Sequence, residues 1–160
     1  GKQKMNKGGR NQQTAQAGEH YVAAELNRRG AYAVTFAGNM PRIDILASNV
    51  TQTRTVSIQI KTRRAGTWQC SITDGEKCKR KSNEDVFWVF VDLSKDRNPP
   101  DYYVVPGWWI RNNIHETHDA YLKKRFGKRA VTLDSKHHAV NHPRLAKWKG
   151  RWDILKIIDA

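Results

Sequence analysis

The stretch that decides the fold is Pro41-Arg-Ile-Asp-Ile-Leu-Ala47, followed after a polar loop by Val56-Ser-Ile-Gln-Ile-Lys61. In both segments apolar and polar residues alternate, which is the two-residue period of a half-buried β-strand. The loop is short enough to fold the second strand back beside the first. The period places Gln59 and Lys61 on one face, and the hairpin can bring Asp44 near that face.

A second acid is expected inside the fold, on a helix predicted for residues 14–29. Glu19 projects into the middle of the apolar face that includes Val22, where carboxylates rarely stay unpaired. Two partners would satisfy it equally well: a metal ion shared with Asp44, or an arginine in a buried salt bridge. Glu25 falls at the edge of the apolar stripe and is expected to be a solvated helix charge.

The order of these residues resembles the PD-(D/E)XK nuclease superfamily. Within it, the segment Gly18–Gly30 resembles the opening helix of archaeal Holliday-junction resolvases, and Gln59-Ile-Lys61 is similar to a variant found in some restriction endonucleases. A closer similarity is to small, mostly uncharacterised bacterial members. It rests on segments like Lys61-Thr-Arg-Arg64, Pro100-Asp-Tyr-Tyr-Val-Val-Pro106 and Arg151-Trp-Asp-Ile-Leu155.

The resemblance covers most of the chain from Gly18 onward and implies a restriction-endonuclease-like α/β fold. In that fold a central mixed β-sheet is flanked by helices. The sequence departs from the family pattern at two places. Gln59 stands where the second acid is usual, and Pro41 lies three positions before Asp44 instead of directly before it.

The resemblance also implies a catalytic site with Mg²⁺ as the ion and Mn²⁺ as a substitute. The metal ligands would be Glu19, Asp44, the side-chain oxygen of Gln59 and the backbone carbonyl of Ile60. Lys61 would orient the attacking water or neutralise developing charge. Because Gln59 carries no charge, we expect weaker metal binding than in an all-acid site, or a preference for a single ion.

Length and composition predict one domain. Its 160 residues suit a single folded unit, with residues 14–160 forming one nuclease-like domain. Residues 1–13 are expected to be a disordered basic arm, because they have almost nothing to bury. Cys70 and Cys78 predict reduced thiols and a cytoplasmic location. Neither a secretory signal nor a membrane span is expected.

Net charge predicts a polyanionic partner. The 29 Lys and Arg residues outweigh 15 Asp and Glu residues, giving +14, which favours nucleic acid. An acidic membrane surface is not expected, because neither a basic amphipathic helix nor a lipidation motif stands out. Structural RNA-binding proteins share this charge, so that charge alone does not indicate an enzyme.

Basic and aromatic residues near the predicted site are the candidates for contact with nucleic acid. The patch after Lys61 could grip phosphates and stack on a base, although Trp68 could equally pack against the domain. The basic run over residues 76–81 could follow a phosphate track or simply solvate one face. The candidates are Arg42, Arg63, Arg64, Trp68, Lys79, Arg80 and Lys81.

The remaining elements follow from their patterns. Residues 85–93 are apolar without alternation, which predicts a central strand covered on both faces. Shorter strands are predicted at 31–36, 102–105 and 131–133, and a helix at 108–125. The C-terminal apolar residues are expected to dock onto the core.

Three functions agree with the sequence. The first is a Mg²⁺-dependent DNA endonuclease of the repair, recombination or restriction type, with branched DNA among its substrates and a homodimer as an open option. The second is a catalytically inactive nucleic-acid-binding module on the same fold, which Gln59 and the displaced Pro41 favour. The third is an RNA-binding structural protein unrelated to nucleases.

Overall fold

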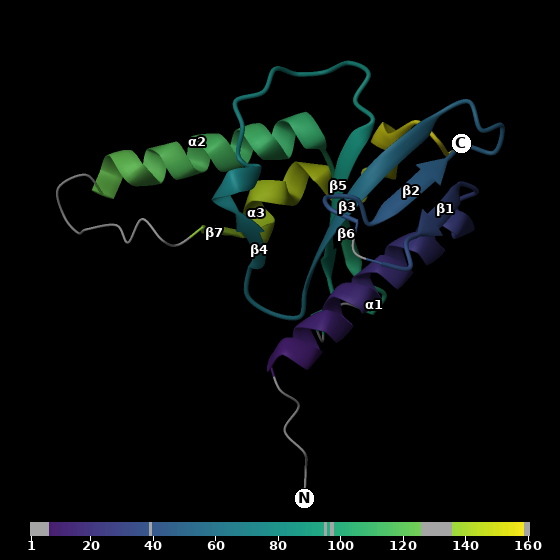
Figure 1. Ribbon diagram of the computed structural model, residues 1–160, viewed down its shortest axis with the longest axis horizontal. Coiled ribbons are helices and arrows are strands. Elements are labelled where there is room, and N and C mark those ends of the chain that lie inside the picture. Colours follow the sequence, from purple (N-terminus) through teal and green to yellow (C-terminus); the bar gives the residue numbers. More distant parts are fainter. Residues whose placement is uncertain (1–6, 39, 95, 97, 126–135, 159–160) are drawn as a thin grey trace, which may run out of the picture.

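The computed structural model describes residues 7–158 except 39, 95, 97 and 126–135 (Figure 1). Its helices and strands follow in chain order. They are α1 (Lys7–Arg28), β1 (Tyr32–Thr35), β2 (Ile45–Ser48), β3 (Thr55–Arg63), β4 (Trp68–Ser71), β5 (Val86–Asp92), β6 (Asp101–Pro106), α2 (Gly107–Arg125), β7 (His137–Val140) and α3 (His142–Leu145). Short 3-10 turns lie at Ile72–Asp74, Ala146–Trp148 and Trp152–Leu155.

Within the described residues, one mixed sheet has the strand order β1-β2-β3-β5-β6. Its strands β3 and β5 are parallel, and the other neighbouring pairs are antiparallel. Ile45 pairs with Ile58 in the β2–β3 hairpin, so the predicted fold-back of these two strands is confirmed. The predicted α/β class, with a central mixed sheet flanked by helices, is confirmed as well.

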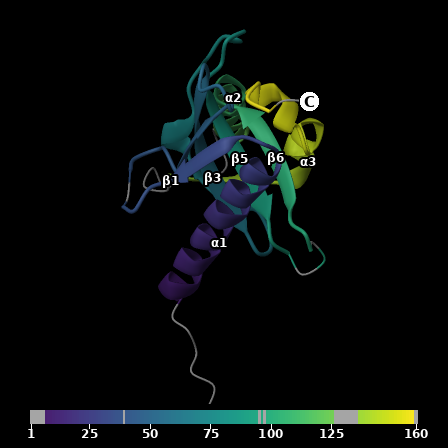
Figure 2. The ribbon, with the colours of Figure 1, turned by 90° about the vertical axis from the view of Figure 1, so that its right-hand side faces the viewer.

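The sheet carries a hydrophobic core on each face. Val22 and Leu26 of α1 pack on one face, whereas Ile110 and Ile114 of α2 belong to the core on the other. Figure 2 shows α1 crossing in front of the sheet while α2 lies behind it. Strand β5 serves both cores, since Val89 and Val91 face α1 while Trp88 and Phe90 face α2. This double burial explains its apolar run without alternation, and the predicted central strand is confirmed.

Helix α1 begins at Lys7, earlier than the predicted start at Thr14. Residues 7–13 of the predicted disordered arm are therefore helical, while residues 1–6 lie outside the described part of the chain. Because Gly8 and Gly9 are poor helix formers, local propensity does not explain this extension, and it is instead continuous with the part of α1 that packs on the sheet. A side-chain contact also holds it, because Arg64 donates a hydrogen bond to Thr14 of α1 at 2.7 Å.

Gly18 lets α1 approach β3 closely. A Cβ atom at Gly18 would overlap the hydroxyl group of Thr62, so no larger residue fits without movement of one element. Glu19 follows Gly18 directly, and the same contact therefore fixes where Glu19 lies along the sheet.

A second, two-stranded sheet pairs β4 with β7, and the sequence did not predict either strand. The predicted strand at 131–133 lies outside the described residues. The C-terminal prediction is confirmed, because Trp152, Leu155 and Ile157 are buried in the α1-side core. Among the described residues, none of the helices has the length and apolar character that crossing a bilayer requires.

Candidate active site

Two carboxyl groups meet where α1 passes the start of β2. Glu19 comes from the middle of α1, and Asp44 directly precedes β2. Burial raises the pKa of Glu19 above its ordinary value, and the neighbouring charge of Asp44 and a hydrogen bond between the two side chains raise it further. The positive charge of His20 opposes this shift of the Glu19 pKa in part. The pair therefore resists full ionisation, as expected for two acids that share a site.

The backbone of β3 holds Asp44 in place. The N–H of Ile60 donates to Oδ2 of Asp44 at 2.7 Å, and the N–H of Asp44 donates to the carbonyl of Ile58 at 2.9 Å. Backbone N–H groups of a strand point within the plane of the sheet. The Asp44 carboxylate thus occupies the space beside β3 that lies just before β2 begins. The carbonyl of Ile60 faces this same side, since the N–H and C=O of a strand residue point the same way.

The two carboxyl groups line a cavity of about 440 Å³, which we call the acid cavity. Gln59 and Lys61 do not line it. Gln59 lines an adjoining cavity of about 280 Å³, the glutamine cavity, and Lys61 lines one of about 590 Å³, the basic cavity. Ile43 contributes to both the acid and glutamine cavities, and Ala15 to both the acid and basic cavities.

The expectation that all four residues share one cavity is therefore corrected. The reason is the two-residue period of β3: Ile58 and Ile60 pack toward the α1-side core, so Gln59 and Lys61 face the opposite side of the sheet. Asp44 remains close to both sides, because its carboxylate accepts the Ile60 N–H and so lies near the plane of the sheet. The structure brings together Glu19, Asp44 and Ile60, with Gln59 and Lys61 in the adjoining cavities.

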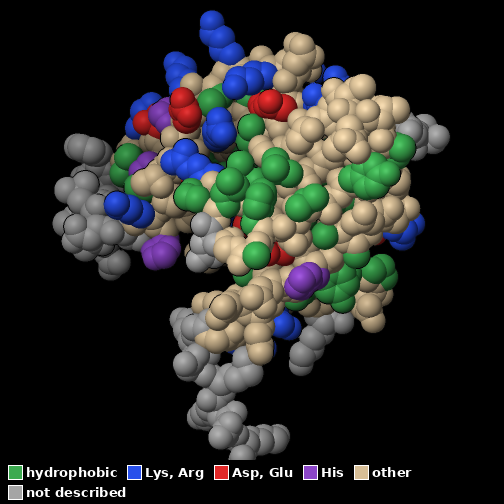
Figure 3. Space-filling view, turned by 45° about the vertical axis from the view of Figure 1, so that its right-hand side comes forward, with side chains coloured by type: hydrophobic (Ala, Val, Ile, Leu, Met, Phe, Trp, Pro, Cys, Tyr) green, Lys and Arg blue, Asp and Glu red, His purple; other side chains and the backbone are tan. Residues whose placement is uncertain are grey.

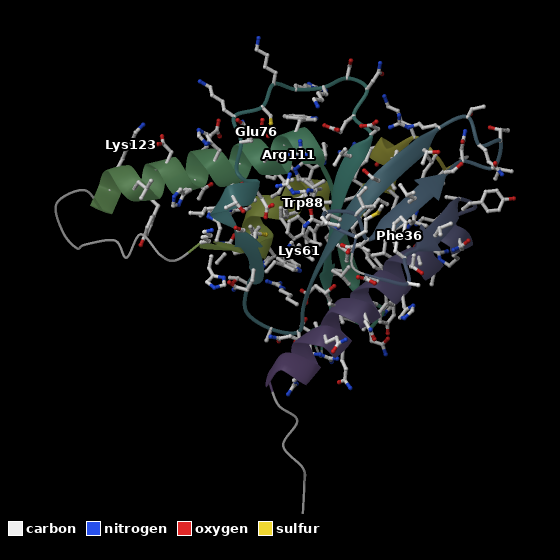
Figure 4. All side chains as sticks on the ribbon, in the orientation of Figure 1. Phe36, Lys61, Glu76, Trp88, Arg111 and Lys123 are labelled. Carbon is white, nitrogen blue, oxygen red and sulfur yellow. The ribbon has the colours of Figure 1, made fainter. Side chains whose placement is uncertain are left out.

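Lys61 lies beside Trp88 on the α2 side of the sheet. Its ammonium group is 5.7 Å from the centroid of the Trp88 ring. Figure 4 shows Arg111, Trp88 and Lys61 one after another, with Phe36 of the acid cavity on the other side of β3. An aromatic face beside an ammonium group favours its charged form and restrains its position.

A divalent ion at this place would have few protein ligands. Among the described residues, no three His, Cys, Asp or Glu side chains gather closely enough to hold a metal ion. Glu19 and Asp44 supply two carboxylates, and the Ile60 carbonyl supplies a neutral oxygen. Such a set fits Mg²⁺, which prefers hard oxygen ligands and keeps several of its own waters.

The prediction that Trp68 stacks on a base is wrong. Trp68 is fully buried, and its indole N–H donates to the carbonyl of Val91 at 3.0 Å. The centroids of the Trp68 and Phe90 rings are 5.5 Å apart in an edge-on arrangement. Trp68 and Cys70 are buried while Gln69 between them is exposed. That alternation is the signal that predicts β4, but it covers only four residues.

Arg63 is also a structural residue. Its guanidinium lies 3.9 Å from the centroid of the Trp68 ring and pairs with the nearly buried Asp92 at 2.9 Å. This pairing lowers the pKa of Asp92 against the opposing effect of burial. The prediction that Arg63 contacts nucleic acid is therefore corrected, because its charge is already neutralised inside the protein.

The other basic candidates are exposed but do not form one patch. Arg42 lines the glutamine cavity and has a φ of 64°, while Arg64 lines the basic cavity. Lys79 is exposed in the loop before β5, and Arg80 and Lys81 line a cavity of about 680 Å³ beside the C-terminal 3-10 turn. Strands β3 and β5 run parallel, so this loop lies at the opposite end of β3 from Arg64. On the face shown in Figure 3, Lys and Arg side chains gather toward the upper left.

Arg10 and Asn11 line the basic cavity with Lys61, and neither was predicted as a site residue. Both fall in the segment that was predicted to be disordered. Their signal is helical spacing, because Arg10, Thr14 and Gly18 recur every four residues and so share the face of α1 that meets β3.

Comparison with known proteins gives weak structural similarity and nothing from sequence. Neither a family model nor a curated protein matches this chain. Among solved structures, a bacterial homing endonuclease, I-Ssp6803I, is similar with a TM-score of 0.49 at 11% sequence identity. The match covers 91% of this chain and 93% of that chain. Neither value is high enough to transfer the activity of that protein to this one.

Proposed function

We propose that this protein is a Mg²⁺-dependent endonuclease that hydrolyses phosphodiester bonds in DNA, with a site of the PD-(D/E)XK type. One observation carries the proposal: Glu19 and Asp44 meet each other in a protein of net charge +14. Among the described residues, the ion pairs of Lys and Arg involve other acids. These are Glu25, Asp92, Asp101, Asp119 and Asp153.

A pair of like charges costs free energy unless a proton or a cation lies between them. In the protein alone the raised pKa of Glu19 favours retention of a proton. A divalent ion would replace it, with Glu19, Asp44 and the Ile60 carbonyl as protein ligands. When bound, such an ion lowers the pKa of a coordinated water and neutralises charge on phosphate oxygens.

The other residues of the site would act on the substrate. Lys61 would donate to a phosphate oxygen or orient the attacking water, because its ammonium lies in the cavity next to the acids. Gln59, which lines the glutamine cavity, would hold a water or a phosphate oxygen through its amide. Since only two carboxylates are present, binding of a single ion is the expected stoichiometry.

The test is cleavage of supercoiled plasmid by the purified chain with Mg²⁺ or Mn²⁺, compared with Asp44→Ala and with a matched acid removed elsewhere, Asp119→Ala. The Asp119 carboxylate is exposed on α2 and pairs only with the exposed Lys123 in the described structure. Nicking or linearisation by the wild type and by Asp119→Ala, abolished in Asp44→Ala, supports the proposal. Unchanged cleavage by Asp44→Ala would overturn it.

A catalytically inactive nucleic-acid-binding module is the second candidate. The observation that favours it is the separation of Gln59 and Lys61 from the acid cavity. DNA binding in EDTA, with cleavage absent under Mg²⁺, Mn²⁺, Ca²⁺ and Zn²⁺, would establish this function in place of the first.

A further inference from the structure

The basic cavity has a lining of unusual chemistry. It lies between the first half of α1 and the turn that joins β3 to β4, and its volume is about 590 Å³. Four cationic side chains line it, and in the described part of the chain its lining contains neither a carboxylate nor an aromatic ring. The cations are Arg10, Lys61, Arg63 and Arg64. A cavity of this size and composition suits an anion with a polar body.

One of these cations is positioned in advance. Nε of Arg64 donates to the hydroxyl of Thr14 at 2.7 Å, and that hydroxyl in turn donates to the carbonyl of Arg10 at 2.9 Å. This chain of hydrogen bonds fixes the Arg64 guanidinium against α1 and uses only Nε. The two terminal nitrogens of Arg64 thus keep their donors for a ligand, in the planar arrangement that matches a phosphate.

Two polar atoms of the lining are buried without a partner among the described residues: Oγ1 of Thr62 and Nε of Arg63. Buried donors in native proteins are almost always hydrogen-bonded, so each of these atoms calls for an explanation. Thr62 lies where α1 passes over β3 at Gly18. A ligand oxygen that enters the basic cavity would give the Thr62 hydroxyl an acceptor, whereas Arg63 stays engaged by Trp68 and Asp92.

The basic cavity adjoins the acid cavity along α1. Ala15 lines both, the basic cavity reaches back to Arg10, and the acid cavity extends forward to Glu19.

We propose that the basic cavity is a phosphate subsite that holds a backbone phosphate of the strand being cut, next to the phosphate at Glu19 and Asp44. This inference rests on the proposed function. Arg10, Arg64 and Lys61 bind the phosphate, and bases are not contacted, because the lining has no aromatic or apolar platform for stacking. The subsite positions the strand without reading its sequence.

The test measures binding to fluorescein-labelled duplexes in EDTA, where cleavage plays no part. The variant Arg10→Gln/Arg64→Gln is compared with Lys123→Gln/Lys124→Gln, which removes the same charge from the last turn of α2, far from the cavity (Figure 4). We expect the first variant to bind about tenfold more weakly at about 0.1 M salt, and the slope of its salt dependence to fall by about 1 for each phosphate that is no longer neutralised. The control should change affinity less than about twofold.

Base independence is the second part of the test. The drop in affinity should be equal for AT-rich and GC-rich duplexes, since phosphates carry no sequence information. Equal affinity of the two charge variants, or a drop confined to one base composition, would overturn the subsite. Plasmid cleavage is scored separately: if the wild type cleaves while Arg10→Gln/Arg64→Gln binds normally, only the subsite is overturned. If the wild type binds but never cleaves, only the endonuclease function is overturned.

The variant Thr62→Val gives a further readout that a purely structural role would not produce. It replaces a buried hydroxyl by a methyl group of similar size, and removing an unpartnered hydroxyl does not destabilise the free protein. We expect unchanged or higher thermal stability together with about threefold weaker duplex binding. Weaker stability with unchanged binding would contradict the role assigned to Thr62.

Discussion

Helix α1 presents two glutamates in opposite electrostatic settings. Glu25 accepts hydrogen bonds from Arg28 at 2.6 Å and Arg29 at 2.8 Å, and these partners lower its pKa. Burial and the neighbouring Asp44 raise the pKa of Glu19. The chain has 29 Lys and Arg residues against 15 Asp and Glu residues. Glu25 pairs with two of these cations, whereas Glu19 lies beside another acid, Asp44. Glu25 behaves as a structural charge, whereas the surroundings of Glu19 disfavour its charged form.

The largest expected difference between the two glutamates is in cleavage. Glu19→Gln removes a charged ligand of the proposed ion and should lower the plasmid cleavage rate about a thousandfold, because the ion supplies several kcal/mol of transition-state stabilisation. Glu25→Gln should change the rate less than about twofold. Similar decreases in both variants, measured by initial rates under Mg²⁺, would remove the distinction.

A smaller effect is expected at Lys61, which assists the acids without holding the ion. Lys61→Met keeps the aliphatic length beside Trp88 and removes the ammonium group. Single-turnover cleavage should fall about a hundredfold, the range typical of a positioned proton-transfer or charge-stabilising group. Mn²⁺ affinity should stay within about threefold of wild type, and failure to bind Mn²⁺ instead would place Lys61 in a structural role.

The close approach of α1 to β3 is tested by stability. Gly18→Ala would bring a methyl group onto the Thr62 hydroxyl, and overpacking of this kind costs about 1–3 kcal/mol. Urea unfolding should show that decrease and its partial recovery in Gly18→Ala/Thr62→Ala. The matched control is Gly38→Ala, because a Cβ at Gly38 meets open space. Full additivity of the two substitutions would show that α1 does not contact β3 at this point.

The smallest effect is the pH dependence of stability in EDTA, and it has opposite signs for the two glutamates. The pKa of Glu19 is raised in the folded state. Its contribution to the free energy of unfolding is therefore complete below the ordinary value of 4.5 and is lost as pH rises through the folded pKa. The folded pKa of Glu25 is lowered, so its contribution is present above 4.5 and is lost as pH falls.

At neutral pH, Glu25→Gln should therefore lose about 0.3–1 kcal/mol, the range of an exposed ion pair, while Glu19→Gln should lose nothing or gain stability. Thermal melts of both variants across this pH range provide the measurement. Destabilisation of similar size in both variants at neutral pH would show that Glu19 has a cationic partner after all.

Sequence periodicity predicted the strands whose pattern of burial is regular along their length, either alternating or buried on both faces. The β2–β3 hairpin and the unalternating run of β5 belong to this group. The β4–β7 pair was missed because each strand is four residues long and joins distant parts of the chain. The burial of Trp68 could not be decided from the sequence for the same reason.

The division of the site into three cavities followed from a pattern that was visible in the sequence. Glu19 lies on the apolar face of α1, and that face must pack on Ile58 and Ile60 of β3. Gln59 and Lys61 alternate with these residues and so face away from α1. The sequence could not show that Asp44 lies in the sheet plane between the two sides, because that depends on where β2 begins.

The central claim is that Glu19 and Asp44 are kept together to bind a divalent ion. Calorimetric titration of Mn²⁺ into wild type, Glu19→Gln and Glu25→Gln at about pH 8, chosen because a higher pH favours the ionised form of Glu19, tests it most directly. We expect one ion bound by wild type and by Glu25→Gln, and at least about tenfold weaker binding by Glu19→Gln. Equal binding by all three proteins, or none by the wild type, would contradict the claim.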